Sequence, residues 1–133
     1  MDPKVVDVSA IIDYLSGFDD GFLGSTLRNR KLQLHIPVVC DLEVTAGLRK
    51  LLLKGLMTEK RARDSLDDYL GLPLWRHDHY RFLRTTWDLR HNFSAYDAAY
   101  VALALVLGAT ILTTDGRLRR AVEQFHSGLV DAL

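Results

Sequence analysis

The sequence lacks the features that mark several common classes of protein. Its single cysteine, Cys40, excludes an internal disulfide and is typical of a reducing compartment. Glycine-rich phosphate-binding loops are absent, so no nucleotide cofactor is indicated. The 17 basic side chains equal the 17 acidic ones in number, so the net charge predicts neither a nucleic-acid partner nor a membrane partner.

Long hydrophobic runs are also missing. The N-terminal residues lack the apolar core of a signal peptide, and the apolar run at 98–107 is too short to span a bilayer. We therefore expect a cytoplasmic protein that does not contact a membrane. The length of 133 residues and the hydrophobic content of 48% suit one packed core, so residues 1–133 are predicted to form a single domain.

Short apolar runs alternate with helical patterns along the chain. Strands are predicted at 5–8, 32–36, 72–75 and 109–114, with a short edge strand at 129–130. Helices are predicted at 9–17, 19–30, 37–54, 58–71, 78–90 and 94–107, and from residue 115 onward. This alternation favours an α/β domain in which helices cover both faces of a central, mainly parallel sheet of four or five strands. In such sheets the functional site lies beyond the carboxyl ends of the strands.

Four carboxylates are predicted to meet at that edge of the sheet. Asp7 falls late in the first predicted strand, and Asp115 directly follows the fourth. Asp97 falls in the first turn of a helix whose other residues, from 95 to 107, are all apolar or aromatic. Glu43 shares a helical face with small residues such as Gly47, which would let its helix approach a neighbour closely.

Each acid also has an ordinary structural interpretation. Ser94 and Asp97 have the spacing of a capping box, and Asp115 fits a helix N-cap. Glu43 fits a solvated helix residue that pairs with a nearby basic side chain. Asp7 is the hardest to explain in this way, because a charged residue in an apolar strand is unusual unless it is paired or binds a cation.

A metal ion would resolve the repulsion among these acids. Clustered carboxylates bind protons near neutral pH unless a cation offsets their charge. Magnesium or manganese suits oxygen ligands, whereas no Cys or His has the ligand spacing of a structural zinc site. A strand end followed by a capped helix explains His77-Asp78-His79 without metal, and a buried, inert thiol explains Cys40.

Four short segments carry a resemblance to a known family. They are Val-Val-Asp7-Val-Ser9, Leu42-Glu43-Val44, Tyr96-Asp97-Ala98-Ala99-Tyr100 and Thr113-Thr114-Asp115. In this order and at these separations they resemble the PIN domain, and especially the VapC-type toxins of bacterial toxin–antitoxin pairs. The resemblance extends from Val5 to at least Val122.

This resemblance implies a three-layer α/β/α fold and metal-dependent cleavage of RNA by water. The acidic pocket would hold one or two Mg²⁺ or Mn²⁺ ions. Asp7, Asp97 and Asp115 would bind metal directly and Glu43 would support a metal or its bound water, so these four are the predicted catalytic residues. An enzyme that used the ribose 2′-OH as nucleophile would instead need two histidines, one as acid and one as base. We find no such pair in the sequence.

Two further groups of side chains are assigned roles beside the metal. The hydroxyls predicted to orient the metal ligands are those of Ser9, Thr113 and Thr114. The basic residues predicted to hold the RNA backbone are Arg117, Arg119 and Arg120.

Apolar residues outside the predicted core point to protein partners. The run Leu51-Leu52-Leu53 and the pair Phe18 and Phe22 are more apolar than the surface of a monomer needs, unless they belong to the core. The resemblance implies a VapB-type antitoxin that wraps the toxin, and a homodimer. Which patch serves which partner stays open, as do the RNA that is cut, cleavage of DNA, and a PIN-like module that binds RNA or protein without cleavage.

Overall fold

A parallel sheet with the strand order β3-β2-β1-β4 runs through the molecule. The computed structural model describes residues 2–18 and 21–131. Its strands are β1 (Lys4–Val6), β2 (Leu34–Pro37), β3 (Leu74–His77) and β4 (Thr110–Leu112). Val5 of the central strand β1 lies opposite His35 on one side and Ile111 on the other. The edge strand predicted at 129–130 is a single parallel bridge between Ile111 and Val130.

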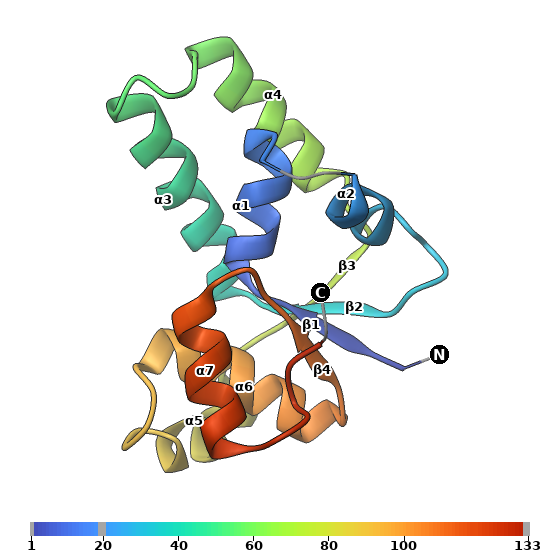
Figure 1. Ribbon diagram of the computed structural model, residues 1–133, viewed down its shortest axis with the longest axis vertical. Helices are drawn as coiled ribbons and strands as arrows, with labels where there is room; N and C mark the ends of the chain where they lie inside the picture. The colour runs from blue at the N-terminus through green and yellow to red at the C-terminus, as the bar shows by residue number, and fades with distance from the viewer. Residues whose placement is uncertain (1, 19–20, 132–133) are drawn as a thin grey trace.

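Helices cover both faces of this sheet. They are α1 (Val8–Ser16), α2 (Phe22–Leu27), α3 (Val39–Leu53), α4 (Glu59–Leu70), the short 3-10 helix η1 (Tyr80–Phe82), α5 (Leu83–Asp88), α6 (Ala95–Leu107) and α7 (Gly116–Phe125). Helices α1 to α4 lie on one side of the sheet and α5 to α7 on the other (Figure 1). The predicted three-layer α/β/α arrangement with a parallel sheet is therefore confirmed. Within the described residues, no helix is long and apolar enough to cross a membrane.

Several predicted boundaries differ from the structure. Pro37 does not begin a helix but ends β2 opposite His77, where the extended backbone needs no donor from proline, and α3 starts at Val39. The helix predicted at 78–90 is divided into η1 and α5. The helix predicted at 19–30 is shorter in the structure, as α2, and residues 19 and 20 lie outside the described part.

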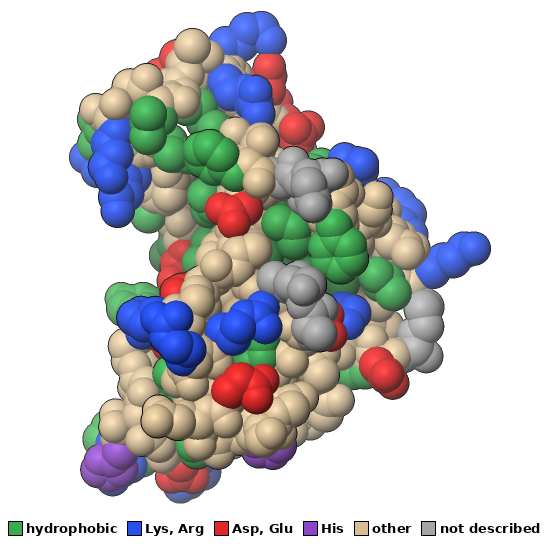
Figure 2. Space-filling view, in the orientation of Figure 1, with side chains coloured by type: hydrophobic (Ala, Val, Ile, Leu, Met, Phe, Trp, Pro, Cys, Tyr) green, Lys and Arg blue, Asp and Glu red, His purple; other side chains and the backbone are tan. Residues whose placement is uncertain are grey.

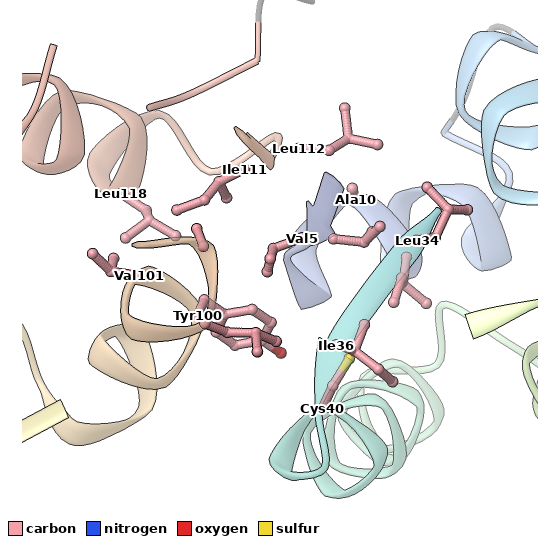
Figure 3. Close-up of a cluster of buried hydrophobic side chains, with 14 of the residues drawn as sticks. Val5, Ala10, Leu34, Ile36, Cys40, Tyr100, Val101, Ile111, Leu112 and Leu118 are labelled. Carbon is pink, nitrogen blue, oxygen red and sulfur yellow. The ribbon is translucent and has the colours of Figure 1, made fainter. Parts of the chain in front are cut away.

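The apolar helix α6 forms much of the core beneath the sheet. Every residue from Ala98 to Ala104 is buried. In Figure 3 the ring of Tyr100 points from α6 toward Ile36 and Cys40, and Val101 lies on the side of α6 that faces Leu118. The Ser94 hydroxyl accepts a hydrogen bond of 3.2 Å from the backbone N–H of Asp97 at the start of the helix. This cap and the packed core together hold Asp97 in the first turn of α6.

Candidate active site

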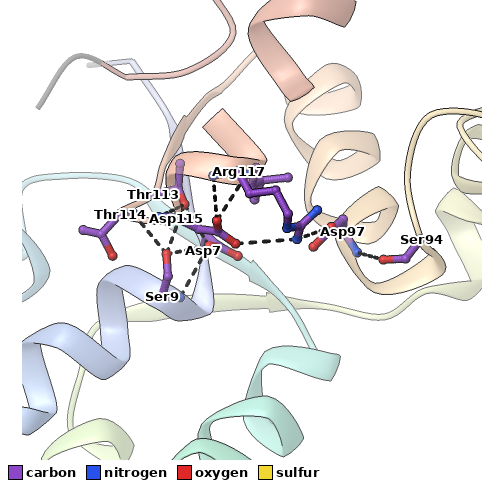
Figure 4. Close-up of polar contacts among 9 residues, drawn as sticks. Asp7, Ser9, Ser94, Asp97, Thr113, Thr114, Asp115 and Arg117 are labelled. Carbon is purple, nitrogen blue, oxygen red and sulfur yellow. Dashed lines mark hydrogen bonds and ion pairs between the residues drawn. The ribbon is translucent and has the colours of Figure 1, made fainter. Parts of the chain in front are cut away.

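Asp7 lies at the carboxyl end of β1 and is the N-cap of α1, so it follows the strand rather than lying within it. Only 4% of the residue is exposed. Its Oδ2 accepts hydrogen bonds from the Ser9 hydroxyl at 2.6 Å and the Thr113 hydroxyl at 2.8 Å (Figure 4). No ion pair to Asp7 is found in the described part of the chain. Burial raises the pKa of Asp7, and the charge of Asp115 raises it further, whereas the hydrogen bonds lower it.

Two of the three predicted residues contact Asp7 through their hydroxyls, the half-buried Ser9 and the buried Thr113, and the third contributes its backbone. The hydroxyls of Ser9 and Thr113 lie 3.0 Å apart and both bind Asp7. Thr113 also accepts a hydrogen bond of 3.0 Å from the backbone N–H of Asp115. Thr114 contributes its backbone N–H, which donates to the Ser9 hydroxyl at 3.0 Å, and its side chain is exposed. Ser9 and Thr113 therefore link Asp7 to the loop that carries Asp115.

Asp115 is the N-cap of α7, as its position after a strand indicates. Its Oδ1 accepts hydrogen bonds from the backbone N–H groups of Arg117 at 2.9 Å and Leu118 at 3.2 Å. The other oxygen, Oδ2, lies 3.6 Å from Nη2 of Arg117. One carboxylate thus orders the helix through one oxygen and faces the other acids with the second.

Asp97 forms only part of the predicted capping box. Its backbone N–H donates to Ser94, but its carboxylate accepts a hydrogen bond of 3.0 Å from Nη2 of Arg117. Asp97 and Asp115, on different helices, therefore share one guanidinium (Figure 4). Capping and a role at the site coexist in both residues.

Glu43 is held by a tyrosine that the sequence analysis did not assign to the site. The Tyr100 hydroxyl on α6 donates a hydrogen bond of 2.7 Å to Oε1 of Glu43 on α3. Burial raises the pKa of Glu43, Tyr100 lowers it, and the charges of Asp7 and Asp97 raise it. Glu43 is therefore not the solvated helix residue of the alternative interpretation. The signal in the sequence was a tyrosine inside an apolar helix, because a buried phenol needs a hydrogen-bond partner.

Close packing positions the helix that carries Glu43. A side chain at Gly47 would place its Cβ 2.7 Å from Cδ1 of Ile12, so the absence of one lets α3 lie against α1 as predicted. Cys40, on the same helix, is buried, and this burial raises its pKa to about 11. The predicted burial of Cys40 is therefore confirmed, and a raised pKa disfavours the reactive thiolate at neutral pH.

We call Asp7, Glu43, Asp97 and Asp115 the acid site. Burial raises the pKa of both Asp7 and Glu43; the charge of Asp115 adds to the shift of Asp7, and the charges of Asp7 and Asp97 add to that of Glu43. Within residues 2–18 and 21–131, however, no three acidic, histidine or cysteine side chains converge tightly enough to hold one ion. The donor chemistry suits a hard cation, because all four side chains are carboxylates and the buried Asp7 forms no ion pair with any described residue. Arg117 supplies the positive charge near Asp97 and Asp115 in this arrangement.

The three predicted RNA-binding arginines differ in their contacts. Arg117 contacts the acid site, whereas the guanidinium of Arg119 donates to the backbone carbonyls of Thr113 at 2.9 Å and Asp131 at 3.1 Å. Arg120 is exposed. Figure 2 shows basic side chains over the beginning of α7 with acidic ones beside them. Basic and acidic side chains are therefore mixed on this surface.

The histidines at the far end of the sheet do not join the acid site. His77 Nε2 lies 2.8 Å from Nδ1 of His35, and burial lowers the pKa of both side chains. The ring of His77 also contacts that of Phe82. His35 and His77 therefore pack against each other, a pairing that the sequence analysis did not predict.

Comparison with known proteins gives both a family and a fold. The family model of the PIN domain matches residues 4–124. Ribonuclease VapC1 and Ribonuclease VapC3 of Mycobacterium tuberculosis are 40% and 32% identical to this chain, over 91% and 92% of its length and 92% and 90% of theirs.

Two solved structures share the fold at low sequence identity. PAE2754 from Pyrobaculum aerophilum is 21% identical with a TM-score of 0.65, covering 90% of this chain and 78% of that chain. VapBC2 from Rickettsia felis, solved bound to a DNA fragment from its promoter, is 15% identical with a TM-score of 0.60, covering 89% of this chain and 92% of that chain. With the family model matched over most of its length, the chain belongs to the PIN domain family.

Proposed function

We propose that this protein is an endoribonuclease toxin of the VapC type, which hydrolyses RNA with Mg²⁺ or Mn²⁺ and is neutralised by a VapB-type antitoxin. Family membership and the relatives named Ribonuclease VapC support the nuclease activity. The observation that carries the mechanism is the buried Asp7, which has two hydroxyl donors and no ion-pair partner in the described chain, and whose pKa is raised further by the charge of Asp115.

The acid site supplies the residues that would hold the metal. We assign Asp7, Asp97 and Asp115 as ligands and Glu43 as the support of a metal or its water. A bound Mg²⁺ or Mn²⁺ would lower the pKa of a water molecule and stabilise charge on the phosphate. Asp97 lies in the first turn of α6, so a small rotation of its side chain changes its distance from the other acids without disturbing the core.

The chain's other polar groups fix the positions of these acids. Ser9 and Thr113 hold one oxygen of Asp7, which leaves Oδ1 free of the hydrogen bonds recorded for Oδ2. Tyr100 holds one oxygen of Glu43 in the same way. Such outer partners keep a ligand in one orientation, and their hydrogen bonds lower its pKa and so favour its ionised form.

The arginines at the start of α7 differ in their access to RNA. We assign Arg120, which is exposed, to the phosphate backbone. Arg117 reaches the backbone only if it leaves Asp97 and Asp115. Arg119 instead braces the loop before α7 through two carbonyls, so its predicted contact with RNA gives way to a structural role.

The direct test compares RNA cleavage by the wild-type protein and the Asp7→Asn variant, with Mg²⁺, Mn²⁺ or a chelator. Asp88→Asn, on an exposed position of α5, makes the same charge change away from the acid site and serves as control. We expect cleavage to need metal and Asp7 but not Asp88. Persistent cleavage in chelator, or products that end in a 2′,3′-cyclic phosphate, would contradict attack by water.

The alternative is a PIN-like module that does not cleave RNA, and the same assay tests it. It would bind RNA or protein in every variant and cut in none. The four acids of the acid site favour the enzyme, because clustered carboxylates are costly to a fold that never binds a cation.

We also propose a homodimer and a cytoplasmic location. Large exposed apolar side chains support a protein partner, and they include Leu42 at 72% exposure and Leu53 at 70%. A groove of about 290 Å³ between α3 and α4, lined by Leu48, Leu52 and Ala62, is suited to an apolar segment of the antitoxin. Light scattering of the purified chain, alone and with its antitoxin, tests both assemblies.

A further inference from the structure

The guanidinium of Arg117 bridges two aspartates of the acid site. Its Nη2 lies 3.0 Å from Oδ2 of Asp97 on α6 and 3.6 Å from Oδ2 of Asp115 at the start of α7. The same two carboxylates are proposed metal ligands. Because Arg117 is only two residues beyond Asp115, the cation is tethered to the site it occupies (Figure 4).

The arginine covers these acids from the solvent side. The side chain of Arg117 is 67% exposed, whereas those of Asp97 and Asp115 are 21% and 35% exposed. Its guanidinium can therefore turn away without removing any group from the core. Arg119 lacks this freedom, because two backbone carbonyls hold its guanidinium.

We propose that Arg117 is a displaceable internal cation that competes with the divalent metal for Asp97 and Asp115. This inference rests on the proposed metal site. Mg²⁺ binds carboxylate oxygens at about 2.0–2.1 Å, so an oxygen that binds the metal would no longer be available to the guanidinium. Without metal, Arg117 offsets the repulsion among the acids. Before a metal ion can bind, the ion pairs of Arg117 with Asp97 and Asp115 must break.

This competition makes Arg117 a determinant of metal affinity rather than a metal-binding or catalytic residue. Removing the guanidinium should strengthen metal binding, because no ion pair then has to break before Asp97 and Asp115 bind the metal. It should also destabilise the metal-free protein, because repulsion among the acids is no longer offset. A residue that merely orders α7 would produce the second effect without the first.

The test measures Mn²⁺ binding by calorimetry, with thermal unfolding of the metal-free protein, for wild type and Arg117→Gln. Arg84→Gln, an exposed arginine on α5, is the control for loss of one positive charge. We expect Arg117→Gln to bind Mn²⁺ about two- to fivefold more tightly, the range that an exposed ion pair supports. Its melting temperature without metal should fall, and the control should resemble wild type in both measurements.

Ionic strength provides a second readout. Because an exposed ion pair is screened by salt, the difference in Mn²⁺ affinity between Arg117→Gln and wild type should shrink as NaCl is raised from about 0.05 to 0.5 M. Equal or weaker binding by Arg117→Gln at low salt would overturn the competition while leaving the metal site intact. Absence of Mn²⁺ binding in both proteins would instead overturn the metal site and the competition together.

Discussion

Tyr100→Phe tests whether the buried tyrosine fixes a catalytic acid or only stabilises the core. Tyr100 is 1% exposed, and its hydroxyl donates a hydrogen bond of 2.7 Å to Oε1 of Glu43. The substitution keeps the ring, so it removes this bond and leaves packing almost unchanged. A hydrogen bond to a charged group contributes about 1.5–3 kcal/mol, and because Glu43 is only partly buried, water recovers some of that on its carboxylate.

We therefore expect Tyr100→Phe to lower the free energy of unfolding by about 1–2 kcal/mol. In a domain of this size that corresponds to a fall in melting temperature of roughly 3–8 °C. Urea unfolding and calorimetry in metal-free buffer measure both quantities. RNA cleavage should fall about 10- to 100-fold, the usual effect of losing an outer partner of a metal site.

Tyr69→Phe is the matched control for this prediction. Tyr69 is 2% exposed, and its hydroxyl donates to a carboxylate, that of Asp41, outside the acid site. The two variants should lose comparable stability, but only Tyr100→Phe should lose cleavage. Equal activity of the two variants would refute the positioning role of Tyr100, and an unchanged unfolding free energy in Tyr100→Phe would refute the hydrogen bond itself.

Two further predictions concern Thr113 and the histidine pair. Thr113→Val removes a buried hydroxyl that binds Asp7 and the N–H of Asp115. Urea unfolding should show a loss of about 2 kcal/mol in the free energy of unfolding, which Thr113→Ser largely restores. An unchanged free energy of unfolding in Thr113→Val would contradict these hydrogen bonds. Burial lowers the pKa of His35 and His77, so the folded state binds fewer protons than the unfolded one. The free energy of unfolding should be constant above a pH of about 6.5 and decrease below it, and the decrease with pH should be smaller in His35→Gln. An equal decrease in both proteins would show that the histidine pair does not cause it.

Local signals account for the parts of the fold that the sequence predicted well. Ser94 caps α6, Thr58 caps α4 and Gly108 ends α6 in a left-handed conformation, as their residue types indicate. Pro37 was placed wrongly because proline suits both the first turn of a helix and the end of a strand, and only pairing with β3 decides between them. The first strand was predicted too long, through Asp7 and Val8, because valine favours a strand. In the structure Asp7 instead caps a helix that begins at Val8.

The contacts that define the acid site depend on residues distant in sequence. Tyr100 and Glu43 are 57 residues apart, and Thr113 and Asp7 are 106 apart. Sequence spacing predicted that the acids lie at one edge of the sheet, because parallel strands end together there. It did not predict which hydroxyl or guanidinium faces each carboxylate, because those choices depend on side-chain orientations that the packed core determines.

Helix starts explain how the fold tolerates acids of like charge in one place. Asp7 begins α1, Asp115 begins α7, and Asp97 lies in the first turn of α6. Backbone N–H groups at a helix start are positive and lack partners within the helix, so each aspartate gains hydrogen bonds or a favourable field there. The same three helices begin at the carboxyl edge of a parallel sheet, which brings their first turns together. Helix capping and the proposed metal binding are therefore compatible roles of the same residues. The caps hold the carboxylates in position, and the negative charge that the caps do not compensate would attract a cation.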